Sequence, residues 1–123
     1  MQILELVVLF FIKHLVVDYF LQRPYQYRNK GIYGHLGGLL HAFNHGITTS
    51  GLLLFYVEDN YHYAIFAGLI DSFLHYHIDW LKIKISTLFN WTPTNSDYFW
   101  HLLGVDQFLH MLTYIWLIYL FVI

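Results

Sequence analysis

The stretch AIFAGLIDSFLHYHIDWLK, residues 64–82, decides the fold class of this chain. It is long and apolar, yet it carries His75 and Asp79 four residues apart. A separation of four places two side chains on the same face of an α-helix, one above the other. The stretch therefore predicts an apolar helix with an ionisable stripe along one face.

The same spacing recurs in three other apolar segments, each time between two side chains of the metal-ligand type. These pairs are His14/Asp18, His41/His45 and Asp106/His110. Ionisable groups are expensive to place inside an apolar helix, so eight of them at one repeated spacing need a common reason. We interpret the repetition as a metal site inside a membrane.

The composition supports a membrane protein. The chain is 58% hydrophobic, 21% aromatic and 11% charged, whereas soluble domains carry about 25% charged residues. Its net charge of −2 shows no excess of basic residues, so nucleic-acid binding is not expected. Because the chain has no cysteine, disulfides, thiolate metal sites and a cysteine nucleophile are excluded.

The fold class predicted is all-α: one domain, residues 1–123, forming an antiparallel bundle of four transmembrane helices. The expected spans cover about 3–22, 36–57, 61–82 and 100–123, each close to the ~20 residues that cross a bilayer core. The first span lacks the flanks of a cleaved signal peptide and is expected to be retained.

A polar turn is expected at Glu58-Asp59-Asn60. Small residues at helix-packing spacing predict close backbone approach; they are Gly34/Gly38, Gly46/Ser50 and Ala64/Gly68.

The basic residues of the connections predict the orientation. Five of them flank the two longer connections: Arg23, Arg28, Lys30, Lys82 and Lys84. The positive-inside rule places these connections in the cytoplasm and both termini outside the inner membrane. Lys82 is interpreted as an interfacial anchor. Four histidines do not fit the stripes and are assigned to loops or interfaces: His35, His62, His77 and His101.

Because successive transmembrane helices would run in opposite directions, the four pairs are predicted to lie at one depth in the membrane, near the cytoplasmic side. The deeper ring would hold His14, His45, His75 and His110, and the shallower ring would hold Asp18, His41, Asp79 and Asp106. Imidazole and carboxylate suit zinc first, with iron or manganese next, as one ion or as two with a bridging carboxylate. The side chains expected to orient these ligands or contact substrate are Gln22, Asn44, Thr48 and Tyr114.

Together these motifs resemble a known family. The signature runs His14-x-x-x-Asp18-Tyr-Phe-Leu-Gln22, Asn29-Lys30, His41-x-x-x-His45, His75-x-x-x-Asp79-Trp-Leu-Lys82 and Asp106-Gln107-x-x-His110. It is similar to the domain of unknown function 3307 membrane proteins of bacteria and their phages, over nearly the whole chain. The resemblance implies a small multi-pass membrane protein with a polar, metal-binding centre, and it implies no particular reaction.

The function expected from the residues is a metal-dependent hydrolase acting on a lipid or another substrate at the membrane interface. A metal ion can supply a water nucleophile at neutral pH, and Asp106 or Asp71 is the candidate general base. Di-iron lipid oxidation ranks lower, because the histidine boxes with adjacent histidines are absent.

Three alternatives stay open: a non-catalytic metal-stabilised membrane protein, a metal or proton conduit, and a polar packing network without metal. The apolar outer halves of the spans disfavour a conduit, which needs polar groups on both sides of the membrane. The expected partners are the lipid bilayer and a lipid substrate, and a homo-oligomer is left open.

Overall fold

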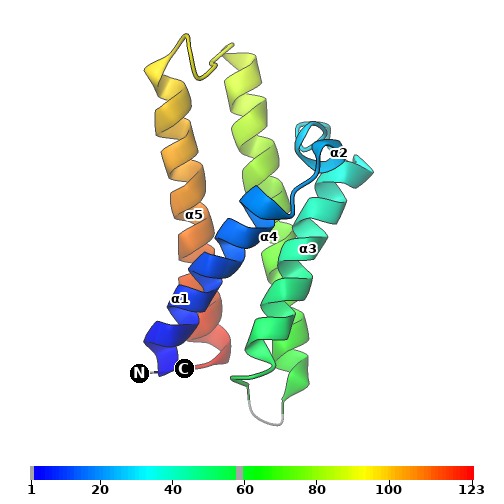
Figure 1. Cartoon of the computed structure of the whole chain (residues 1–123), viewed down its shortest axis with the longest axis vertical. Coiled ribbons are helices and arrows are strands. Elements are labelled where there is room, and N and C mark those ends of the chain that lie inside the picture. The colour runs from blue at the N-terminus through cyan, green and yellow to red at the C-terminus, as the bar shows by residue number, and fades with distance from the viewer. Residues whose placement is uncertain (1, 58–59) are drawn as a thin grey trace.

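Residues 2–57 and 60–123 are described by the computed structural model, and their regular elements are helices (Figure 1). The elements are α1 (Gln2–Leu15), a π-helical turn η1 (Val16–Phe20), α2 (Pro24–Tyr27), α3 (Leu36–Leu53), α4 (Tyr61–Leu88) and α5 (Asp97–Phe121). The all-helical prediction is confirmed over these residues. The expected turn at Glu58-Asp59 lies outside the described residues.

The long helices alternate in direction along the chain (Figure 1). α1 runs from the end that holds both termini toward α2, α3 returns, α4 runs back and α5 returns again. At the far end α4 and α5 extend beyond the other helices. The antiparallel order predicted from the sequence is therefore present.

Three local features differ from the predicted boundaries. The α-helix of the first segment ends at Leu15 and continues as the π-helical turn, in which the Leu21 N–H donates to the Val16 carbonyl oxygen at 3.0 Å. α2 begins at Pro24, since proline suits the first turn of a helix. α4 continues to Leu88, past the predicted end at residue 82, and stops before Asn90, whose φ of 54° is left-handed.

α3 and α4 approach each other closely through glycines. A Cβ atom added at Gly46 would lie 2.5 Å from the Gly68 carbonyl oxygen, and one added at Gly68 would lie 2.5 Å from the Gly46 carbonyl oxygen. Ser50 and Ser72 fill the remaining space beside these glycines. The contact holds together the two helices that carry His45 and His75, as the spacing of Gly46/Ser50 and Ala64/Gly68 predicted. Gly34 was predicted to make a similar approach but has no atom within 4 Å of an added Cβ.

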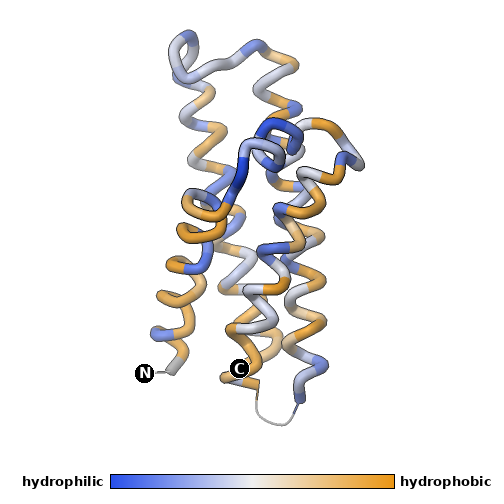
Figure 2. Tube along the Cα trace, turned by 45° about the vertical axis from the view of Figure 1, so that its right-hand side comes forward, coloured by the Kyte–Doolittle hydropathy of each residue, from blue (hydrophilic) through white to orange (hydrophobic). Residues whose placement is uncertain are grey.

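Polar and apolar side chains occupy different halves of the interior. A cluster of apolar side chains, including Leu6, Phe10, Leu53 and Leu117, fills the half that holds the termini. Figure 2 shows that hydrophilic positions concentrate in the half that holds α2. The buried ionisable side chains therefore lie next to a layer of packed apolar side chains.

The outer surface is strongly apolar. Phe55 is 88% exposed and Phe20 is 74% exposed, and large apolar side chains are exposed along all the long helices. By length and composition, one helix of the described residues, α5, is suited to crossing a membrane. Buried polar side chains beneath an apolar surface are the reverse of the usual distribution in water-soluble domains.

Candidate metal centre

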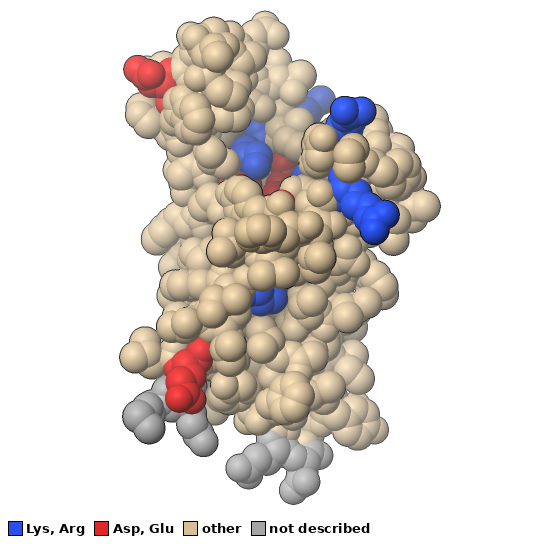
Figure 3. Space-filling view, in the orientation of Figure 1, with Lys and Arg blue, Asp and Glu red and all other residues tan. Residues whose placement is uncertain are grey.

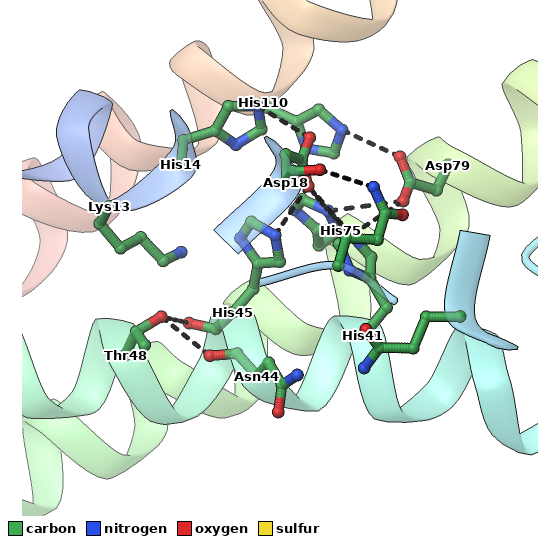
Figure 4. A network of polar contacts seen from close by, with 12 residues as sticks. Lys13, His14, Asp18, His41, Asn44, His45, Thr48, His75, Asp79 and His110 are labelled. Carbon is green, nitrogen blue, oxygen red and sulfur yellow. Dashed lines mark hydrogen bonds and ion pairs between the residues drawn. The ribbon is translucent and has the colours of Figure 1, made fainter. Parts of the chain in front are cut away.

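Histidines from two helices converge on the carboxylate of Asp18 (Figure 4). The Nε2 atoms of His45, His41 and His75 lie 2.9, 3.0 and 3.6 Å from Asp18 Oδ1. His41 and His45 come from α3, His75 comes from α4, and Asp18 comes from the π-helical turn. Asp18 is therefore carried by a π-helical turn, and such turns are frequent at functional sites.

The four ligand atoms of this group fit a metal ion. They lie within 4.8 Å of one another. In a tetrahedral site with bonds of 2.0–2.1 Å, ligand atoms are roughly 3.3 Å apart. The Nε2–Oδ1 separations to Asp18 and the 3.1 Å between the Nε2 atoms of His41 and His75 fall around this value. Three histidines and one aspartate suit zinc, iron or manganese.

A second group adjoins the first and shares His75. His75, Asp79 and His110 also place their ligand atoms within 4.8 Å of one another. His110 Nε2 is 3.4 Å from Asp79 Oδ1, and His75 Nε2 is 3.5 Å from Asp79 Oδ2. The His75 and His110 rings stack with their centroids 4.1 Å apart.

The remaining two predicted ligands border these groups. His14 Nε2 lies 3.2 Å from Asp18 Oδ2, and His14 Nδ1 lies 2.8 Å from the Tyr114 hydroxyl oxygen. Asp106 Oδ1 lies 3.7 Å from His110 Nε2. All eight residues predicted as ligands therefore gather in one cluster.

Lysines neutralise three of the four carboxylates in this region. Lys13 Nζ is 2.6 Å from Asp71, Lys30 Nζ is 2.7 Å from Asp79, and Lys82 Nζ is 3.4 Å from Asp106.

Asp18 is different, because no lysine or arginine of the described residues lies within ion-pair distance of it. Its side chain is 9% exposed, and its charged contacts are to histidines alone. A nearly buried carboxylate needs a compensating charge, and a bound cation is the strongest available.

The residues predicted to support the ligands act in different ways. Tyr114 contacts a ligand ring, as expected, through the hydrogen bond to His14. Gln22 donates to the Asp18 backbone carbonyl oxygen at 2.6 Å and does not reach its carboxylate. The Thr48 hydroxyl donates to the backbone carbonyl oxygens of Asn44 and His45. Its hydrogen bonds are therefore to the backbone of its own helix and not to a histidine ring.

Asp71, one of the two candidate bases, is fully engaged on one oxygen. Its Oδ2 accepts hydrogen bonds from Lys13 Nζ and from the Thr49 hydroxyl at 2.6 and 2.5 Å. The Lys13 ammonium also lies 4.6 Å from the centre of the Tyr114 ring. Asp71 thus belongs to a buried ion pair beside the ligand cluster.

Four further residues of the site were not predicted from the sequence: Lys13, Lys30, Thr49 and Gln107. Gln107 Oε1 lies 3.1 Å from His14 Nε2, and its Nε2 donates to Asp106 Oδ2 at 3.0 Å, so it joins two ligands. Lys13 carried a usable signal, because a lysine inside an apolar segment requires a buried partner. Lys30 and Gln107 belong to the family signature but were given no role in the site, and Thr49 carried no signal.

Two residues of the cluster region, Lys82 and Asp106, line a groove at the surface. Figure 3 shows a hollow in which basic and acidic atoms lie below the surrounding apolar surface. A groove of about 220 Å³ between α4 and α5 has apolar walls and includes Lys82 and Asp106 in its lining. A larger groove of about 570 Å³ lies along α3 and α4, but none of the predicted ligands lines it.

Residues 6–123 match the family described as "Protein of unknown function (DUF3307)". The match covers essentially the whole chain, so this protein belongs to that family, as its motifs indicated. No curated protein and no solved structure matches the chain.

Proposed function

We propose that this protein is an integral membrane protein that binds a divalent metal ion. Its ligands are Asp18, His41, His45 and His75, with zinc as the first candidate and iron or manganese next. One observation carries the proposal: three imidazole Nε2 atoms converge on Asp18 Oδ1, the one carboxylate of the described cluster without a lysine partner.

The distribution of apolar surface supports placement of the whole bundle in a membrane. The long helices expose large apolar side chains on their outer faces, and most of the clustered ionisable side chains are buried. α5 has the length and composition of a span. We propose that α1 with its π-helical turn, α3 and α4 also cross the bilayer, with the basic end in the cytoplasm.

We further propose that the centre hydrolyses a lipid or another substrate at the membrane interface. A bound divalent ion would supply a water nucleophile at neutral pH and polarise an ester or phosphoryl oxygen. Asp106 is the better placed of the two candidate bases, since its Oδ1 atom lies 3.7 Å from His110 Nε2 and the residue lines the groove between α4 and α5. Asp71 is held by Lys13 and Thr49.

The groove between α4 and α5 supports an amphiphilic substrate. Its apolar walls suit an acyl or isoprenoid chain, and its lining includes Lys82 and Asp106, of which Asp106 lies 3.7 Å from His110 in the cluster.

Incubation of the purified, metal-loaded protein with a bacterial lipid extract, followed by lipid mass spectrometry, tests this activity. We expect a lipid to be consumed by the native chain and by Asp97→Asn, whose substitution lies at an exposed site, but not by Asp18→Asn. Equal lipid profiles with native and Asp18→Asn protein would exclude the hydrolase.

The second candidate function is a metal-stabilised membrane protein without catalysis. Four protein ligands close a tetrahedral site, and structural zinc sites are closed in this way. In this case chelation would lower the unfolding temperature, and no lipid would turn over. Conduction is disfavoured, because Leu6, Phe10 and Leu53 belong to the apolar cluster that fills the other half of the bundle.

A further inference from the structure

We infer that the centre holds two metal ions, each bound by two histidines and one aspartate. The first set is Asp18, His41 and His45, and the second set is His75, Asp79 and His110. The inference rests on the metal binding proposed above, adds a second ion, and moves His75 from the Asp18 site to the second set. Each set comes from neighbouring segments: the π-helical turn with α3, and α4 with α5.

His75 stands at the boundary between the sets. Its Nε2 atom is 3.6 Å from Asp18 Oδ1 and 3.5 Å from Asp79 Oδ2, so distance alone assigns it to neither carboxylate. One imidazole nitrogen binds one ion. If His75 joins Asp18, then Asp79 and His110 remain as a buried pair without the third member of their group. If His75 joins Asp79, both sets have three ligands.

The environment of His110 is an independent argument for an ion in the second set. The residue is 1% exposed, and its Nε2 atom has no hydrogen-bond partner among the described residues. That atom is aimed at the second set, because it lies 3.4 Å from Asp79 Oδ1. A buried, unpartnered imidazole nitrogen facing a carboxylate oxygen is explained by an ion between them.

Asp79 lies between the two sets. Its Oδ1 atom faces His110, while its Oδ2 atom lies 3.4 Å from His41 Nε2 in the first set and 3.5 Å from His75 Nε2. Lys30 contacts Oδ2 and leaves Oδ1 for the second ion. Paired metal sites place their ions about 3.5–4 Å apart, a distance that a carboxylate spans.

The division into two sets has a chemical consequence. Three protein ligands leave at least one position of each ion open, which is the arrangement of catalytic sites, whereas four ligands close a structural site. Two open positions side by side can hold the attacking and the leaving oxygen of a displacement. The second set adjoins Asp106, which lines the groove between α4 and α5.

Metal stoichiometry of the full chain in detergent tests the inference. The protein is stripped with chelator, reloaded with Zn²⁺, freed of excess ion and measured by elemental mass spectrometry. We expect two ions per chain in the native protein and one ion in either His45→Ala or His110→Ala. His101→Ala removes an exposed histidine from the same helix as His110 and should retain both ions.

Three other results of the metal measurement would contradict either the second site or metal binding altogether. A native chain that saturates at one ion overturns the second site and leaves the proposed metal binding intact. A His110→Ala variant that keeps two ions also overturns it. A native chain without metal contradicts the proposed function itself.

A measurement on the native protein avoids dependence on the folding of variants. Loading with Mn²⁺ should give an electron paramagnetic resonance spectrum of two exchange-coupled ions, since the sites are expected to lie about 3.5–4 Å apart. A spectrum of isolated Mn²⁺ ions at saturation would overturn the inference.

Discussion

At the scale of single residues, the centre is defined by how its carboxylates are neutralised. Asp71, Asp79 and Asp106 each have a lysine within 3.4 Å, whereas Asp18 faces histidines. Neutral histidines do not compensate a carboxylate in a medium of low dielectric constant. The difference in charge compensation, more than the number of histidines, is our reason for proposing a cation at Asp18.

Replacing Lys13 with methionine should destabilise the protein strongly. Its ammonium is paired with Asp71 at 2.6 Å, and the side chains are 4% and 1% exposed. Removing one partner leaves a buried charge without compensation, so we expect a loss of about 3–5 kcal/mol in the free energy of unfolding. Chemical denaturation in detergent micelles measures the loss.

The double variant Lys13→Met/Asp71→Leu removes both charges and should recover most of this stability. Lys84→Met, which replaces an exposed lysine on α4, is the control and should be nearly neutral. If Lys13→Met behaves like Lys84→Met, the buried ion pair is not formed.

The candidate ligands were predictable from the sequence, and most of their counterions were not. A spacing of four in an apolar segment identifies pairs such as His75/Asp79 without knowledge of the fold. Lys13 and Asp71 are 58 positions apart, and no local pattern connects residues at such a separation. Lys30 comes from the connection before α3 and meets Asp79 on α4 only when the chain is folded.

At the scale of elements, the π-helical turn and the contact between α3 and α4 set the geometry of the site. The turn carries Asp18, and α3 and α4 carry the histidines that surround it. Gly46 and Gly68 allow these two backbones to approach closely. We therefore expect the metal site to be sensitive to volume added at this contact.

Gly46→Ala tests the contact. The added Cβ atom would lie 2.5 Å from the Gly68 carbonyl oxygen, so the helices must separate. We expect a loss of about 1–3 kcal/mol in stability and weaker zinc binding, both measured in detergent. Gly51→Ala on the same helix meets no atom within 4 Å and is the matched control. Equal zinc affinity in the two variants would contradict the proposed role of the contact.

The long helices were predictable because their apolar runs and polar interruptions are local features. The π-helical turn was not, because Val16–Phe20 has the composition of the helix that precedes it. α2 was expected as a loop after Arg23-Pro24, yet Gln26 closes a capping interaction by accepting from the Arg23 N–H at 2.9 Å. α4 is longer than predicted because the apolar pattern continues beyond Lys82, at Ile83, Ile85 and Leu88.

At the scale of the whole molecule, an apolar half and a polar half lie along one axis. The termini share the apolar end, and the connection between α4 and α5 lies at the other end (Figure 1). The polar centre is closer to the basic connections. In a membrane this arrangement would give the site access from one side.

Cysteine labelling tests the placement in the membrane, because the native chain has no cysteine. We expect Arg28→Cys and Asn95→Cys to react with an impermeant maleimide only after the cell membrane is opened, and Ile123→Cys to react in intact bacteria. These three positions are exposed. Reaction of all three in intact cells, or the reverse pattern, would contradict the proposed orientation.

The metal content of the purified chain tests the proposed site at Asp18. The protein is extracted into detergent without chelator, and its bound metals are measured by elemental mass spectrometry beside Asp18→Asn and Asp97→Asn. We predict at least one divalent ion per chain in the native protein and in Asp97→Asn, with most of it lost from Asp18→Asn. A native chain with only traces of metal, or an Asp18→Asn variant with the native amount, would contradict the account.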